Sequence, residues 1–213
     1  MLIRHRKTTP EVDASAFVAP TAVLIGRVRV DARARILYGA VLDSEGSAVE
    51  VGTSSIVSEN AVLRATAVGA AAAPVILGDH VFVGPHATLL GCTVEPCSFL
   101  ATGVTVLQGA TIKTGGVVGV GALVHAGTVI PPEFFVPPNA VAIGDPVTLY
   151  GPDDGEALLA AIKSLGFSNT AFGVDVASRD RASIYRDVTE VRSEEYSAHF
   201  DDVVLNDDNF EGK

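Results

Sequence analysis

The feature that most constrains the fold is an apolar residue that recurs every six positions. The first run of this repeat occupies Val12, Val18, Leu24, Val30, Ile36 and Leu42. The repeat resumes over residues 51–63 and, after an Ala-rich insertion at 65–74, continues over 77–136 with a single five-residue step after Leu89. A period of six fits neither an α-helix, which repeats apolar residues at three and four, nor a half-buried strand, which repeats them at two.

A six-residue repeat with a small residue near its fifth position is typical of a parallel β-helix with three sides. Each hexad forms one flat side, three hexads form one coil, and coils stack at about the 4.8 Å spacing of paired strands. The sequence is 48% hydrophobic but only 6% aromatic, which suits a narrow core of Val, Ile, Leu and Ala. The sequence therefore predicts a mainly β fold of about seven coils over residues 12–141.

The repeat ends near residue 150, so we expect a β-helix domain over 1–150 and a helical segment with an acidic tail over 151–213. Asp153 and Glu156 form a D-x-x-E pattern that can cap the start of a helix. The expected apolar stripe of this first helix contains Leu158, Leu159, Ile162 and Leu165. A second helix is expected over about 177–199, with an apolar face made of Ile184, Tyr185, Val188 and Val191.

The formal net charge of the chain is −10, and it is uneven. Residues 151–213 contain 14 acidic and 6 basic residues, a net charge of −8. Nucleic acid is therefore not expected as a partner, because phosphate binding needs clustered Lys and Arg. The acidic segment is interpreted either as a solvated end or as a docking segment for a basic protein partner.

Two further expectations follow from hydropathy and cysteine content. No apolar run approaches the roughly 18–20 residues of a membrane span, and residues 1–13 lack the apolar stretch of a secretory signal. We therefore expect a cytoplasmic protein without membrane contact. Cys92 and Cys97 are too few for a disulfide framework and are expected to be inward-facing core thiols.

Several segments together resemble the γ-class carbonic anhydrases and their relatives. They are VDASAFVAPTAVLIGRVRV, ILYGAVL, LLGCTV and VPPNAVAIGDPV, and the resemblance covers residues 10–150. It implies a left-handed parallel β-helix of hexapeptide repeats that assembles as a homotrimer. In that family, three histidines from two neighbouring subunits bind a zinc ion, and the metal-bound water hydrates CO₂.

The resemblance also identifies which residues stand at the zinc-ligand positions of the family. These are Arg64, Pro85 and Leu90. Arginine stays protonated in proteins, and proline and leucine have no side-chain donor. We therefore expect no zinc at these positions, no other cofactor and no carbonic anhydrase activity.

Other residues of the same region are changed as well. Asp43 stands where the family has Arg, and Glu45 where it has Asp, so Asp43, Glu45, Glu59 and Arg64 are expected to lie close together. One interpretation is a salt-bridge network at the trimer interface that closes the former cavity. The other is a remodelled pocket in which Arg64 holds an anion and a carboxylate acts as acid or base.

Three functional hypotheses remain open at this stage. The first is a non-catalytic structural or accessory trimer that binds a partner. The second is an enzyme of different chemistry, such as a hydrolase, an isomerase or an acyl or CoA-type transferase acting on a small anionic substrate. Its candidate catalytic residues are Asp43, Glu45, Glu59, Arg64 and His86. The third is metal binding elsewhere, through His86 or His125.

Overall fold

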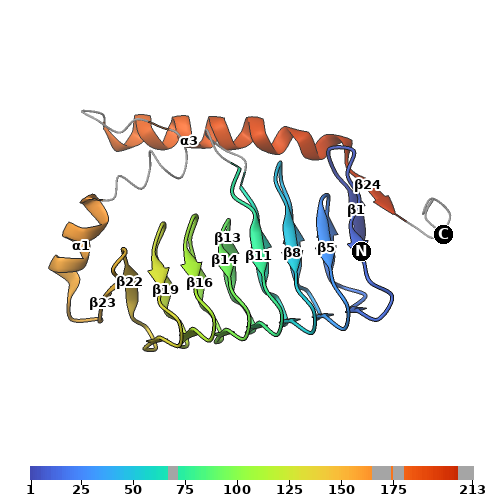
Figure 1. The fold of residues 1–213 in the computed structure, drawn as a ribbon. Coiled ribbons are helices and arrows are strands. Elements are labelled where there is room, and N and C mark those ends of the chain that lie inside the picture. Colours follow the sequence, from blue (N-terminus) through green and yellow to red (C-terminus); the bar gives the residue numbers. More distant parts are fainter. Residues whose placement is uncertain (67–71, 165–173, 175–179, 206–213) are drawn as a thin grey trace.

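The computed structural model describes residues 1–66, 72–164, 174 and 180–205. Within these residues, the chain winds into stacked rungs whose strands form three sheets, one on each side (Figure 1). The predicted parallel β-helix of hexapeptide repeats is confirmed. Residues 11–143 form seven successive sets of three strands, as the spacing predicts, and one additional strand precedes them.

Each sheet collects one strand from every coil, in register with the next. The first sheet contains β2 (Glu11–Val12), β5 (Val28–Val30), β8 (Val49–Val51), β11 (Val75–Leu77), β14 (Thr93–Val94), β17 (Thr111–Ile112) and β20 (Val129–Ile130). The second contains β3 (Phe17–Val18), β6 (Arg35–Ile36), β9 (Ile56–Val57), β12 (Phe82–Val83), β15 (Phe99–Leu100), β18 (Val117–Val118) and β21 (Phe135–Val136).

The third sheet is the longest of those described, because two antiparallel strands extend it at its ends. Its parallel strands are β1 (Leu2–Arg4), β4 (Val23–Ile25), β7 (Val41–Asp43), β10 (Val62–Arg64), β13 (Thr88–Leu90), β16 (Thr105–Val106), β19 (Leu123–Val124) and β22 (Val141–Ile143). The antiparallel strands are β23 (Thr148–Tyr150), which pairs with β22, and β24 (Val203–Leu205), which pairs with β1.

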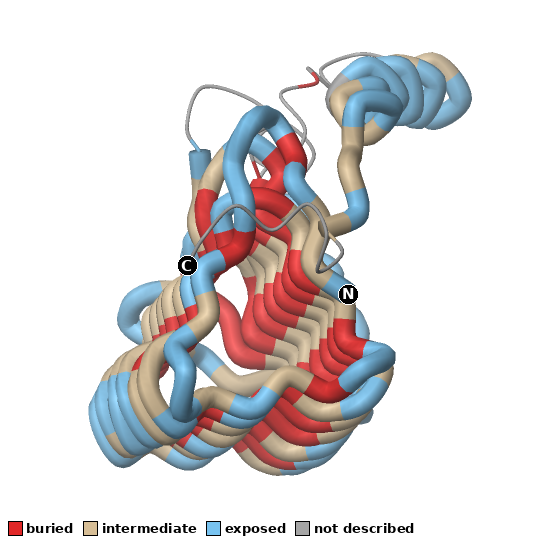
Figure 2. Tube along the Cα trace, turned by 90° about the vertical axis from the view of Figure 1, so that its right-hand side faces the viewer, coloured by how far each residue is buried: buried red, intermediate tan, exposed pale blue. Residues whose placement is uncertain are grey.

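The predicted hexad anchors form the core. Leu24, Leu42, Leu63 and Leu89 are fully buried and lie directly above one another in the ladder of the third sheet. Figure 2 shows such buried positions lining the inside of the rungs along the whole stack. Because each rung places one large apolar side chain inward on each side, burial follows the six-residue period.

The cysteine prediction is right for one residue and wrong for the other. Cys92 is buried, and burial raises the pKa of its thiol to about 12. Cys97 is exposed, because it occupies a corner between two sides with a φ of 60°. A residue in this left-handed corner conformation lies outside the inward-facing part of the hexad.

In the described part of the chain, two helices follow the repeat, as expected, but their faces differ from the prediction. In α1 (Gly155–Ser164) no residue is buried, and Leu159 is exposed; Leu165 lies outside the described residues. In α3 (Arg181–Tyr196), which begins at 181 rather than about 177, Ile184 is buried whereas Tyr185 is exposed. The periodicity therefore identified helices without identifying the contact face of each.

The segment after α3 returns the chain to its beginning. α3 runs along the stack to the coil that contains β1, where a 3₁₀ turn, η1 (Ser197–Asp201), leads into β24 (Figure 1). β24 then pairs antiparallel with β1, with Ile3 opposite Val204. The last described residues are thus part of the largest sheet.

Candidate functional site

The candidate site lies at the outer corner where β7 and β10 end. The parallel register aligns Asp43 with Arg64, and Arg64 with Leu90. These residues follow the inward leucines Leu42, Leu63 and Leu89, so their side chains point to the opposite face of the sheet. The repeat itself therefore places one charged pair in adjacent coils at this corner.

Arg64 is held mainly by Glu45. Its Nε donates a hydrogen bond of 2.8 Å to Glu45 Oε1, and its Nη2 bonds the same oxygen. Arg64 Nε lies 3.8 Å from Asp43 Oδ2, so Asp43 is the more distant carboxylate. The Glu45 side chain is fully buried, and its Oε2 has no hydrogen-bond partner within the described part of the chain.

α3 covers this corner with an aromatic ring and a second arginine. The guanidinium groups of Arg64 and Arg192 lie over the ring of Tyr196, at 4.5 Å and 4.6 Å from its centroid. Arg192 Nη2 also lies 4.0 Å from Glu45 Oε1. Cation–π contacts of this kind contribute about 0.5–1 kcal/mol each where they are exposed. Arg64 is therefore fixed between the β-helix and the C-terminal helix of its own chain.

The environment of Asp43 at this corner shifts the pKa of its carboxyl. Burial raises the pKa of its carboxyl above the ordinary value, and the neighbouring Glu45 carboxylate acts in the same direction. The hydrogen bond that Glu45 N–H donates to Asp43 at 2.9 Å, and the charge of Arg64, oppose this shift without cancelling it.

A second cluster joins this corner to the first strand. His199 Nε2 lies 3.9 Å from Asp43 Oδ2, and His199 Nδ1 lies 2.9 Å from Asp202 Oδ2. Asp202 Oδ1 in turn lies 2.6 Å from Nδ1 of His5, which is completely buried. The rings of His5 and His199 are stacked with their centroids 4.4 Å apart.

The remaining predicted site residues lie elsewhere in the chain. Glu59 and His86 occupy the corner that precedes β10 and β13, where His86 N–H donates to the Glu59 carbonyl at 3.0 Å. Arg64 lies at the other end of β10. The expectation that Glu59 lies beside Glu45 is therefore wrong within one chain, because a full strand separates them. His86 is exposed, and its corner position gives it a φ of 58°.

Sequence reasoning missed Arg192, Tyr196, His199, Asp202 and His5. Each lies outside the hexapeptide repeat, and only the fold-back of the C-terminal segment brings them to the corner. The sequence offered one signal for this cluster, the histidines His5 and His199, but the repeat pattern does not show that they lie together.

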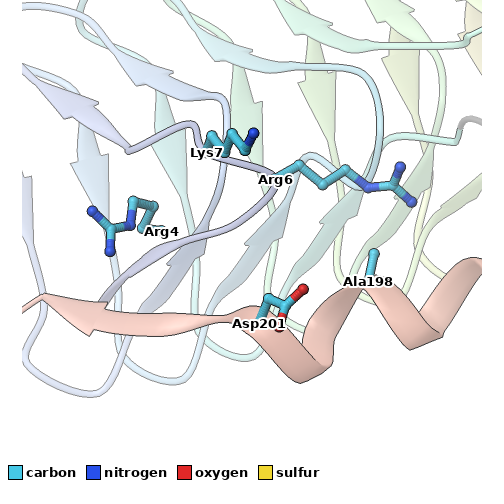
Figure 3. Close-up of a pocket in the computed structure, with 5 residues that line it drawn as sticks. All are labelled: Arg4, Arg6, Lys7, Ala198 and Asp201. Carbon is cyan, nitrogen blue, oxygen red and sulfur yellow. The ribbon is translucent and has the colours of Figure 1, made fainter.

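A basic cavity of about 480 Å³ lies beside this cluster, lined by Arg4, Arg6, Lys7, Ala198 and Asp201. Figure 3 shows that the side chains of Arg4 and Arg6 extend in different directions. Arg6 and Lys7 form the tip of the turn between His5 and Thr8. The positive groups therefore do not converge on one point, as a compact anion site would require.

The six-residue repeat and the three sheets define a β-helix protein of the hexapeptide-repeat class. A hexapeptide transferase family protein from Anaplasma phagocytophilum has the same fold, with a TM-score of 0.58 and 23% identity over 91% of this chain and 97% of that one. More specifically, the predicted resemblance to γ-carbonic-anhydrase-like proteins is confirmed. The chain is 38% identical over 116 residues to "Gamma carbonic anhydrase 1, mitochondrial" of Arabidopsis thaliana.

That alignment covers 51% of this chain and 42% of the relative. A second relative, "Gamma carbonic anhydrase-like 1, mitochondrial" of the same plant, is 36% identical over 41% of this chain and 35% of its own length. The chain thus spans less than half the length of these curated relatives. No family model matches it. Among the described helices, none is both long and apolar enough to span a bilayer.

Proposed function

We propose that this chain forms a γ-carbonic-anhydrase-like homotrimer that has lost the zinc site and acts as a structural or accessory protein. One observation carries the proposal: Arg64, at the position of the first zinc ligand, is bound to the buried carboxylate of Glu45 in its own chain. A fixed positive charge at this place repels a divalent cation. Leu90, its neighbour in the ladder, offers no donor atom.

The outer surface of the second sheet supports contact between copies of the chain. Its register aligns Phe82, Phe99, Val117 and Phe135 in one row on successive coils. Phe99 and Phe135 are 44% and 54% exposed, although Phe82 and Phe99 stack at 4.8 Å. A row of partly exposed apolar residues on neighbouring coils is typical of a surface that associates with another chain. Light scattering tests the trimer: a mass of three chains of 22.0 kDa is expected.

The test of the lost zinc site is CO₂ hydration measured by stopped flow with zinc supplied. We expect the wild-type protein to hydrate CO₂ no faster than buffer. The matched variant restores the three ligands as Arg64→His, Pro85→His and Leu90→His, with the histidine at position 85 supplied by a neighbouring subunit, and measurable CO₂ hydration is expected only there. Hydration by the wild-type protein above the buffer rate overturns the proposal.

The acidic segment 151–213 is the proposed docking surface for a basic protein partner, because it carries a net charge of −8. The exposed residues Glu190 and Glu194 of α3 provide the test. Once a partner is isolated, Glu190→Lys with Glu194→Lys should abolish its binding without changing the mass of the trimer. A cytoplasmic location stays a prediction, which cell fractionation tests; the names of both curated relatives include the word mitochondrial.

A specific observation favours the alternative of an enzyme with different chemistry. Buried carboxyl groups with a raised pKa, such as Asp43, are typical of acid–base sites, and Glu45 Oε2 lacks a hydrogen-bond partner among the described residues. Arg64→Ala separates the two proposals. A structural role predicts a loosened C-terminal helix or trimer. An enzymatic role predicts loss of an activity, such as acetyl-CoA hydrolysis, from intact trimers.

A further inference from the structure

Two imidazoles and one carboxylate converge where the chain's first and last elements meet. His5 Nδ1 and His199 Nδ1 face the two oxygens of Asp202, at 2.6 Å and 2.9 Å. The three donor atoms lie within 4.8 Å of one another. We propose that His5, His199 and Asp202 form a binding site for a divalent transition-metal ion, with zinc as the matching ion. Imidazole nitrogen and carboxylate oxygen are common zinc ligands in proteins.

The backbone holds His5 in position before any metal binds. His5 N–H donates to the Thr8 carbonyl at 3.0 Å, and the Thr8 N–H and hydroxyl both donate to the His5 carbonyl, at 2.9 Å and 2.8 Å. These bonds close a tight turn, and the His5 side chain is completely buried beneath it. Ordering a ligand in advance lowers the entropy cost of binding an ion.

The other two ligands are held by the fold-back of the C-terminal segment. His199 and Asp202 lie three residues apart, and Asp202 N–H donates to the His199 carbonyl at 3.2 Å. β24 starts at the next residue and pairs with β1, with Val203 opposite Arg4. The pairing of the two strands therefore sets the distance between His5 and Asp202.

Metal binding requires a particular ring proton on each histidine, and the structure has room for it at His199. A neutral imidazole carries one ring proton, so a metal at Nδ1 requires that proton to lie on Nε2. In His199 this Nε2–H then faces Asp43 Oδ2, which lies 3.9 Å away. Histidine ligands commonly donate their second N–H to a carboxylate that orients the ring. At 3.9 Å the contact is an electrostatic one and not a hydrogen bond, so Asp43 acts on the His199 ring through its charge.

At His5 the same proton shift has a different consequence. His5 Nε2 accepts a hydrogen bond from Arg6 Nε at 3.2 Å, and a protonated Nε2 cannot accept it. Arg6 is exposed and borders the cavity of Figure 3, and metal binding at Nδ1 would break its hydrogen bond to the ring. The proposal therefore predicts that Arg6 opposes metal binding.

A competing set of donors, formed by Asp43, Glu45 and His199, is less suitable. Arg64 already bonds Glu45 and lies 3.8 Å from Asp43, so a metal ion there would meet a fixed positive charge. By contrast, Arg6, the arginine beside the His5 site, donates to Nε2 of His5, the ring nitrogen that would not hold the metal ion. The structure thus favours metal binding by the Nδ1 atoms of His5 and His199 over metal binding at the corner of Asp43 and Glu45.

The experiment is calorimetric titration of zinc chloride into the untagged, chelator-treated full chain. We expect one zinc per chain and a melting temperature that rises with zinc concentration, because the ion binds the folded state. His199→Gln and His5→Gln should remove this binding. Asp43→Asn should weaken it, because the neutral amide no longer attracts the Nε2–H of His199 as a carboxylate does. Arg6→Ala should bind zinc at least as tightly as the wild type.

His80→Asn is the matched control, because His80 is an exposed corner histidine with a left-handed φ of 56°, which asparagine tolerates. It should bind zinc like the wild type. If buried His5→Gln fails to fold, His199→Gln decides the question, since its side chain is 28% exposed. Absence of zinc binding by the wild type, or undiminished binding by folded His199→Gln, overturns the proposal.

Discussion

Removing the positive charge of Arg64 should lower the free energy of unfolding, because it leaves a buried carboxylate without its partner. The Arg64→Met variant keeps most of the side-chain volume but leaves the Glu45 carboxylate, which is completely buried, without its hydrogen-bonded cation. Breaking a buried ion pair from one side costs about 3–5 kcal/mol. The lower end applies here, because the Arg64 side chain is 26% exposed and Arg192 lies 4.0 Å from the same oxygen.

We therefore expect the free energy of unfolding to fall by about 3 kcal/mol in Arg64→Met. For a chain of this size that corresponds to a melting temperature lower by about 6–12 °C. Urea denaturation followed by circular dichroism at neutral pH measures the change. Protein concentration must be held constant between variants, because dissociation of an oligomer would also shift the transition.

The double variant Arg64→Met with Glu45→Leu separates pairing from packing. If the loss comes from a stranded carboxylate, replacing that carboxylate as well should restore about 2 kcal/mol, because a pair of apolar groups leaves no buried charge. A cost below about 1 kcal/mol in Arg64→Met, or a double variant equal to the sum of the single variants, would refute this account of Arg64.

Three other predictions concern groups outside this pair. Burial raises the pKa of Asp43 in the folded state above its value in the unfolded chain. As pH rises from about 4 through that raised pKa, the free energy of unfolding of the wild type should therefore fall relative to that of Asp43→Asn, and urea denaturation at several pH values measures the difference. A thiol reagent at pH 8 should modify only Cys97 in the native protein and also Cys92 after unfolding, counted by mass spectrometry; two modified thiols in the native state would contradict the structure. Gly52→Ala should cost about 1–3 kcal/mol, because its Cβ would lie 2.5 Å from the backbone of the next coil, whereas Gly155→Ala, with open space, should not destabilise; calorimetry compares them.

The β-helix was predictable because one rule governs each of its sides. Every coil repeats the same choice of an inward apolar residue, so the positions of Leu24 and Leu89 follow from spacing alone. The closeness of Asp43 and Arg64 followed from the same rule, since both occupy the same place in successive coils. Cys97 was assigned to the core because a count of six does not show where the chain turns a corner.

The contacts of the C-terminal segment were not predictable in the same way. An amphipathic pattern indicates a helix but not the surface that it covers, and Tyr185 is exposed although it belongs to the predicted apolar face. Tyr196 and His199 reach Arg64 and Asp43 only because α3 runs along the whole stack. Contacts between residues so distant in sequence depend on tertiary packing, which local propensity does not contain.

The position of α3 changes how the former ligand corner should be understood. One interpretation placed Arg64 in a salt-bridge network at the trimer interface; in the described chain its partner Glu45 and its covering residue Tyr196 belong to its own chain. Because His199 follows the same helix and contacts Asp43, the corner and the proposed metal site share one structural support. Variants at Asp43 should consequently affect both, whereas Arg64→Met should leave zinc binding unchanged wherever α3 stays docked.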